Sequence, residues 1–297
     1  MAALEDQFRY AFAGNLNPFG GSGWSGPGRK ESQQRMPMIR KVSSDGVGYS
    51  VVELNDHRHV FAAAIPRSGT TLREQTEDAL RTIQAVMDEE RTHGAIVQQA
   101  VFVRDFDKLD ECREIIRRFY GKDAMPATSY IAQPPCDGKL VAIEALGVGN
   151  DNGGIEIERH SERMVVTRHD GISWFHCADI RPDTISNGTY DRSTDAFLRM
   201  MRRLADRGVP YGNVIRTWLY LGDIVGAEGE TQRYKELNRA RADLYEDLRF
   251  GAGLTPPGLN GNVYPASTGI GTDGRDILMS CIGLTTDRDD VVVTPLE

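Results

Sequence analysis

Arginine and aromatic residues alternate along one apolar run of the chain, NVIRTWLYL. Because successive side chains of a β-strand point to opposite faces, Arg216, Trp218 and Tyr220 would share one face of a strand. A guanidinium flanked by aromatic rings can clamp a carboxylate over an apolar floor. The competing interpretation is that Arg216 pairs with a structural carboxylate such as Asp223 or Asp179.

A second candidate group lies in the run YPASTGIG near the end of the chain. Ser267, Thr268 and Gly269 would supply two hydroxyls and an unencumbered backbone N–H for a developing oxyanion. Ordinary hydrogen bonding at the end of a strand is the alternative. Tyr264 and Tyr234 either close over the same site or only pack.

Few other side chains suggest chemistry. Glu144 lies on an apolar strand, where burial would raise its pKa and suit it to general acid catalysis, or where it forms a salt bridge between strands. His57 and His59 have a spacing that metals use, but no third ligand is evident, so no metal is predicted. No glycine-rich phosphate loop precedes a helix, and no cofactor is expected.

Hydrophobic periodicity places these residues on two similar series of elements. In residues 47–149 two strands precede a helix at about 71–90, and a further strand, a second helix and two final strands follow. The same order returns in residues 171–290, so each half reads β-β-α-β-α-β-β. MPATSYIA and YPASTGIG occupy corresponding places, which indicates a duplication. Two α+β units follow, each a sheet with two helices on one face.

The bare face of each sheet must be covered within the chain or between chains, and a small-molecule site is expected at that junction. Residues 1–46 are predicted to be a flexible N-terminal arm, because residues 14–34 are rich in Gly, Ser and Pro. The remaining boundaries are drawn at 47–150 and 151–297.

Composition excludes several classes of function. The 297 residues carry a formal charge of -8, which argues against a nucleic-acid partner. Arg199, Arg202, Arg203 and Arg207 cluster, but at the spacing of a solvated helix face. No apolar run is long enough to span a membrane, and no signal pattern opens the chain, which predicts a cytoplasmic protein. The four scattered cysteines are expected to be free, buried thiols.

The run from AIVQQAVFVRD through DECREIIRRFYG and PATSYIA to LVAIEALGVG resembles the Rid/YjgF superfamily. The second half, through RTWLYLGDI, RYKELNRARADLY and YPASTGIG, is similar to the chorismatase branch of that superfamily. The resemblance implies two tandem chorismate-mutase-like domains, assembly as a homo-oligomer with trimers favoured, and ligand clefts between units. It also implies a cationic clamp and a carboxyl group acting on a small carboxylate substrate. Arg241 matches an arginine of the chorismatase signature, or is simply a solvent-exposed helix residue.

The chain departs from the family pattern at the expected catalytic positions. Thr128 replaces the arginine of the Pro-Ala-Arg-Ser motif, and Ala142 replaces the first glutamate of the last strand. Without an arginine to bind a substrate carboxylate through two parallel hydrogen bonds, residues 47–150 are predicted to be catalytically inactive as an imine deaminase. In the second half the last strand, DILMSCIGL, offers no glutamate as proton donor. Cys177 lies where Rid proteins place a cleft residue and is either a nucleophile or an inert buried thiol, and Asp179 could assist a water molecule.

Three functions remain open. The preferred hypothesis is a chorismatase-like hydrolase or lyase that acts on a cyclic or enolpyruvyl carboxylate in a cleft between Rid-like units. The second is a diverged 2-imine or enamine deaminase, and the third is a catalytically silent ligand-binding or scaffold protein. The expected catalytic group is Glu144, Cys177 and Asp179. The expected substrate-binding residues are Arg216, Tyr220, Tyr234, Arg241, Tyr264, Ser267, Thr268 and Gly269.

Overall fold

Two six-stranded sheets with the same topology form the molecule, and a computed structural model describes residues 38–44, 46–92, 95–184, 188–251, 253–256, 258–259 and 263–294. The first sheet has the strand order β1-β2-β3-β6-β4-β5, and the second has β7-β8-β9-β14-β10-β13 when followed from β7. We call residues 38–149 the first unit and residues 156–286 the second unit. This α+β arrangement of tandem units confirms the fold predicted from the sequence.

The first unit consists of β1 (Met38–Ser44), β2 (Val47–Leu54), β3 (His57–Ala64), α2 (Leu72–Glu89), β4 (Ala95–Val103), the 3-10 turn η1 (Phe106–Lys108), α3 (Leu109–Tyr120), β5 (Ala127–Ala132), the 3-10 turn η2 (Cys136–Gly138) and β6 (Val141–Gly149).

The second unit consists of β7 (Glu156–Ser161), β8 (Met164–His169), β9 (Ile172–Ile180), α4 (Thr189–Ala205), the 3-10 turn η3 (Tyr211–Asn213), β10 (Val214–Gly222), the short β11 (Ala227–Glu228) and β12 (Thr231–Gln232), α5 (Arg233–Tyr245), β13 (Ala266–Thr272) and β14 (Ile277–Thr286).

Each unit has more strands than the sequence pattern indicated. β1 precedes the two strands expected in the first unit, and β7 and β8 both lie ahead of residues 171–290, where the second series was expected. β1 lies inside the stretch assigned to the flexible arm, and all seven of its residues pair with β2, so that assignment is wrong for residues 38–44. Residues 1–37 of the predicted arm lie outside the described residues.

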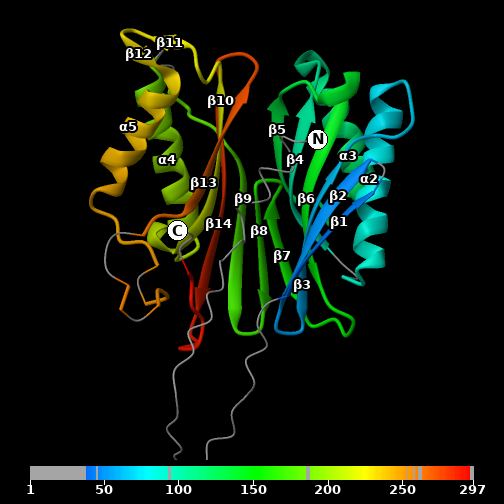
Figure 1. Ribbon diagram of the computed structural model, residues 1–297, viewed down its shortest axis with the longest axis horizontal. Helices are drawn as coiled ribbons and strands as arrows, with labels where there is room; N and C mark the ends of the chain where they lie inside the picture. Colours follow the sequence, from blue (N-terminus) through cyan, green and yellow to red (C-terminus); the bar gives the residue numbers. More distant parts are fainter. Residues whose placement is uncertain are drawn as a thin grey trace, which may run out of the picture.

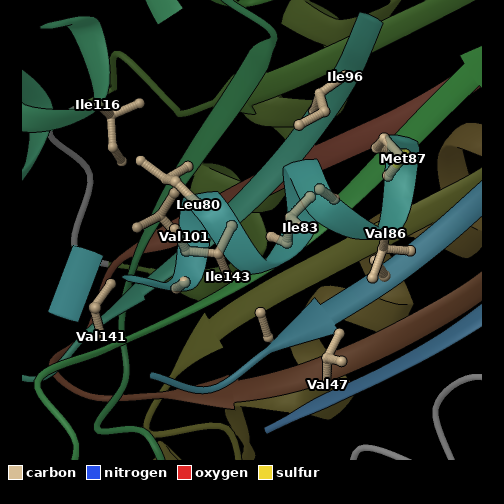
Figure 2. Packing of buried hydrophobic residues seen from close by; sticks show 14 of the residues in the cluster. Val47, Leu80, Ile83, Val86, Met87, Ile96, Val101, Ile116, Val141 and Ile143 are labelled. Atoms are coloured by element: carbon tan, nitrogen blue, oxygen red, sulfur yellow. The ribbon is translucent and has the colours of Figure 1, made fainter. Parts of the chain in front are cut away.

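The helices cover only the outer face of each sheet (Figure 1). α2 begins at a capping box in which the Thr71 hydroxyl accepts from the Glu74 N–H and the Glu74 carboxylate accepts from the Thr71 N–H. Its apolar residues, among them Leu80 and Ile83, pack on Val101 and Ile143 of the sheet (Figure 2). α4 and α5 cover the second sheet in the same way. No helix within the described residues is long and apolar enough to cross a membrane.

The two bare faces pack against each other, as the sequence led us to expect. A shared apolar cluster joins Val97, Leu146 and Val148 of the first unit to Trp174 and Ile282 of the second. The outer edge of β5 is also covered: the Thr128 N–H donates to the Glu162 carbonyl at 2.8 Å, and the Asp273 N–H donates to the Ala132 carbonyl at 2.8 Å. Edge strand β5 is therefore protected by the second unit.

Candidate functional site

Two polar groups lie at the junction of the units, and the first is built from β6 and β10. Trp218 and Tyr220 belong to the apolar contact between the sheets, whereas Leu219 belongs to the core under the helices. The alternation predicted for this strand is therefore confirmed. The guanidinium of Arg216 lies over the indole of Trp218, 4.8 Å from its ring centroid, and donates to the Thr268 hydroxyl at 2.6 Å.

Glu144 reaches the same region from the first unit. Its carboxylate atom Oε1 is buried and has no hydrogen-bond partner among the described residues, and the same is true of Arg216 Nε. Burial raises the pKa of Glu144 to about 7, and the positive charge of Arg216 opposes that rise. Burial also lowers the pKa of Arg216. The two charges face each other across the unit boundary without an ion pair at 4.0 Å or less.

Tyr220 completes this group, and its own surroundings are apolar. Its ring meets Phe102 edge-on at 6.4 Å between centroids. Burial raises the pKa of Tyr220 well above its ordinary value, and the Glu144 charge acts in the same direction. The phenol therefore stays protonated at neutral pH and can serve only as a neutral hydrogen-bond donor or acceptor. We call Glu144, Arg216, Trp218, Tyr220 and Thr268 the junction group.

The second polar group surrounds a cavity of about 390 Å³. Asp179, which is 5% exposed, forms ion pairs with Arg163 at 3.2 Å and Arg181 at 2.8 Å. Its backbone has a φ of 49°, and the β9–β14 register shifts beside it. This irregularity directs the carboxylate to the cavity wall, as β-bulges do beside many sites. The walls are formed by Arg113, Arg117, Thr128 and Tyr130 of the first unit and Ser161, Glu162, Arg163 and Asp179 of the second.

Serine hydroxyls join the strands between these two groups. Ser129 Oγ accepts from the Asp179 N–H at 2.9 Å and lies 2.8 Å from Ser280 Oγ. Ser280 lies next to Trp218 in the β10–β14 ladder. A buried line of hydroxyls thus runs from the cavity wall to the strand that carries the junction group.

The predicted residues on β13 lie at the edge of the second sheet, next to β10. Ser267 Oγ donates to the Pro265 carbonyl at 3.1 Å and lies 2.7 Å from the Thr217 hydroxyl. Gly269 faces the ring of Tyr234, because a Cβ there would lie 2.8 Å from a ring carbon. Tyr234 is 37% exposed. Thr268 contacts Arg216, whereas Ser267 and Gly269 point to the opposite face of the sheet, where Thr217 and Tyr234 of α5 lie.

Other predicted residues lie elsewhere. Tyr264 stacks on Tyr245 with ring centroids 6.0 Å apart and is 56% exposed. Arg241 lies on α5, where its charge acts on Tyr245 rather than on the junction group. Cys177 is fully buried in the core under the helices, opposite Cys281.

The ion pairs of Asp223 and Asp179 test the alternative that one of them neutralises Arg216. Asp223 pairs with Arg275, and Asp179 pairs with Arg163 and Arg181, so neither carboxylate neutralises Arg216. All four cysteines are free, but Cys136 is exposed, which corrects the expectation that every thiol is buried.

The cavity lined by Arg163 and Asp179 was not predicted from the sequence. Part of its wall is a turn between two strands that the hydrophobic periodicity did not reveal.

Comparison with known proteins supports the family resemblance. Residues 152–283 match the family described as chorismatase FkbO/Hyg5-like, N-terminal. The match lies within the second half of the chain, so that half is similar to this family. No curated protein sequence matches the chain.

Solved structures with partial similarity to the chain were also found. A chorismatase crystal structure has 15% identity and a TM-score of 0.49, and the match covers 84% of this chain and 80% of that one. A YjgF family member from Neisseria meningitidis has 22% identity and a TM-score of 0.33, covering 38% and 97%. A YjgF/YER057c/UK114 family member from Mycobacterium tuberculosis has 14% identity and a TM-score of 0.29, covering 40% and 84%. Because all three TM-scores are below 0.5, no argument rests on these similarities.

Proposed function

We propose that the chain is a chorismatase-like enzyme that hydrolyses a cyclic or enolpyruvyl carboxylate at the junction group. One observation carries the proposal. A carboxyl from the first unit and a guanidinium from the second each direct a buried, unpartnered atom into the contact between the sheets. A bound ligand would supply the missing hydrogen-bond partners, because leaving a buried polar atom unpaired costs roughly 1–3 kcal/mol.

In the proposed reaction Arg216 holds the substrate carboxylate, using Nε and the face of Trp218. Glu144 is the general acid, since a carboxyl with a pKa of about 7 stays protonated in part of the neutral range. It gives its proton to the terminal vinyl carbon of an enol ether. Water then adds to the resulting oxocarbenium carbon, and the hemiketal collapses to pyruvate and the free alcohol while a proton returns to Glu144. Tyr220 and Thr268 position the substrate.

Access to the junction group lies along β13. Arg216 is 8% exposed, but Thr268 is only partly buried, and Ser267 and Gly269 are exposed. A ligand that enters here replaces solvent at Ser267 and Thr268 and reaches Arg216 from its Thr268 side. Neither a metal, a cofactor nor nucleic acid takes part in this proposal.

We further propose that the chain assembles with copies of itself, with a trimer favoured. β13 ends the second sheet as β5 ends the first, and β5 is covered by the turn at Glu162. Within the two units that the structure describes, no third unit is present to cover β13 in the same way. A neighbouring chain would protect that edge and enclose the rim of the junction group.

A ligand-binding protein without chemistry is the second candidate, and Ser280 favours it. This residue occupies the place in the second unit that Glu144 occupies in the first, so the second unit has no acid of its own. The arginine-lined cavity beside Asp179 is large enough for a small anion and supports binding without requiring catalysis.

Incubation with chorismate separates the two candidates. The proposal expects pyruvate release, followed by a coupled lactate dehydrogenase assay, and expects Arg216→Ala to abolish it. Arg202→Ala, on the exposed side of α4, is the matched control and should keep full activity. If neither chorismate nor a 2-imino acid turns over while small aromatic carboxylates still raise the Tm, the binding candidate replaces the enzyme. A folded Arg216→Ala variant with undiminished ligand binding removes the clamp in either case.

A further inference from the structure

A third polar group lies at the junction, and the proposed function does not use it. His57 at the start of β3 and His169 at the end of β8 come from different units, and their rings are 4.4 Å apart between centroids. Asp170 lies between them: its Oδ2 is 2.7 Å from His57 Nδ1 and 3.1 Å from His169 Nδ1. The further ligands that the sequence did not show beside His57 are thus supplied by the second unit.

We propose that His57, His169 and Asp170 form a binding site for a divalent transition-metal ion of the zinc type. Two imidazole nitrogens and one carboxylate oxygen are a donor set that such ions prefer. The three candidate ligand atoms lie within 4.8 Å of one another. Ligands of a tetrahedral zinc ion stand roughly 3.4 Å apart, so only small movements bring these three into place, and a fourth position stays open to water.

Two buried imidazole nitrogens beside the group have no hydrogen-bond partner among the described residues. His169 Nε2 and His59 Nε2 are both buried without a hydrogen bond among the described residues. His169 is 6% exposed and His59 is 5% exposed, and their rings are 5.2 Å apart. Offering Nδ1 to a metal moves the His169 ring proton to Nε2 and gives up the hydrogen bond from Nδ1 to Asp170 Oδ2, which shared coordination of the ion by both atoms would replace.

His57 needs one further adjustment. Asn150 accepts the Asn152 N–H at its Oδ1 and therefore donates from Nδ2 to His57 Nε2 at 3.0 Å. Ligation through Nδ1 puts the ring proton on Nε2, and a half-turn of the Asn150 amide then lets its oxygen accept that proton. The cost is the bond to the N–H of exposed Asn152, which water can replace.

Charge and access also permit an ion at this position. The Asp170 side chain is 21% exposed, which leaves an entry path on one side of an otherwise buried group. The nearest cation, Arg288, donates to the Asp170 carbonyl, and its charge is paired with Asp290 at 2.6 Å. A bound ion would link β3 to the β8–β9 hairpin and so fasten the two units together at this end.

Zinc titration of the untagged, chelator-treated full chain tests the proposal. Isothermal calorimetry should give one site per chain with a micromolar or lower Kd. Zn²⁺ at about 100 times Kd should raise the Tm by about 5 °C. Co²⁺ should give the visible absorption of a four-coordinate ion and quench Trp174, whose indole stacks on His169 with centroids 6.2 Å apart.

Ligand variants locate the ion. His169→Gln and Asp170→Asn should each weaken Zn²⁺ binding at least about 10-fold. The matched control His160→Gln replaces a histidine that pairs with Glu158 away from the group and should bind as the wild type does. Asn150→Asp should tighten binding about 10-fold, because a carboxylate accepts the Nε2 proton of a metal-bound imidazole without a half-turn.

Two results would overturn the assignment. One is a wild-type Kd for Zn²⁺ weaker than about 1 mM, which needs no variant to fold. The other is equal weakening in His169→Gln and His160→Gln, which would mean that bound zinc is held by surface histidines. Neither result bears on chorismate turnover, so this site and the proposed function stand or fall separately.

Discussion

The two units have the same strand register but different side chains at equivalent positions. In the first unit Ala100 lies between Ser129 and Glu144 across neighbouring strands, and in the second Trp218 lies between Thr268 and Ser280. Gln98 and Arg216 correspond in the same way, and each follows a register shift at the start of its strand. Equivalent positions of the two units can therefore be compared residue by residue.

This comparison shows how chemical groups are divided between the copies. The first unit keeps the carboxyl, Glu144, but has Gln98 where the second has Arg216. The second unit keeps the cation but has Ser280 where the first has Glu144. Neither unit holds both groups on its own sheet, and only the packing of bare face on bare face brings them together. The proposed site at the junction would require both units.

Some differences between the units concern packing alone. Gln99 Nε2 donates to the Thr128 hydroxyl at 3.0 Å in the first unit, and Thr217 and Ser267 make the equivalent contact at 2.7 Å in the second. Both Thr128 and Ser267 also donate to the carbonyl of the proline two residues earlier. Conserved local geometry with changed side chains is the physical trace of the duplication.

Replacing Arg216 of the second unit by glutamine, the residue at the equivalent position of the first unit, should have the largest effect on activity. In Arg216→Gln the charged donor is lost while the strand keeps a residue that the equivalent position accepts. We expect kcat/KM for chorismate to fall about 10²–10³-fold, the usual effect of removing one charged or oxyanion-stabilising donor. Pyruvate release measures it.

Gln98, the residue of the first unit that corresponds to Arg216, supplies the control for that experiment. The Gln98 side chain makes two long contacts, Nε2 with the Cys177 carbonyl and Oε1 with His176 Nδ1, both at 3.4 Å, so Gln98→Ala should leave kcat/KM within a few-fold of the wild type. If both variants lose activity equally, the effect comes from the packing of the junction and Arg216 has no special role.

Replacing Glu144 by Gln tests the acid that the first unit contributes. Its pKa is about 7 in the folded chain against an ordinary value of about 4.5, so the folded state binds the proton more tightly. The free energy of unfolding of the wild type therefore contains a contribution that is complete below about pH 4.5 and is lost as pH rises to about 7. Over that window the loss is at most about 3 kcal/mol.

Urea unfolding at pH 5 and pH 8 measures this contribution. Glu144→Gln should be less dependent on pH than the wild type and should gain stability relative to it at pH 8. The same acid predicts that wild-type kcat/KM falls above about pH 7. Identical pH dependence of unfolding in both proteins would contradict a buried, unpaired carboxyl.

Much of this arrangement could be predicted from the sequence. The repeated order of elements, the shared face of Arg216 and Trp218, and the packing of bare faces follow from periodicity. The meeting of Glu144 with Arg216 could not, because it depends on how two sheets rotate against each other. A direct alignment of AIVQQAVF with NVIRTWLY would have revealed Gln98 as the counterpart of Arg216.

The missed features share a physical cause. β1 and β7 are edge strands with many exposed or partly buried residues, so their hydrophobic signal is weak. Without β7 and β8, the turn that carries Arg163 and the hairpin that carries His169 were both invisible, and with them the cavity and the third ligand beside His57. Asp179 was found as a candidate, but its bulge and its two arginine partners depend on tertiary contacts.

The smallest expected difference between the units concerns their equivalent hydroxyls. Thr128 is 2% exposed, and Thr128→Val leaves the Gln99 amide donor buried without its acceptor, at a cost of about 1–3 kcal/mol. Ser267 is exposed, so in Ser267→Ala water replaces the lost contacts and the cost should stay below about 1 kcal/mol. Urea unfolding of the two variants measures both costs. Equal costs would show that the solvent exposure of β13 is lost in solution, as it would be if a neighbouring chain covered that edge.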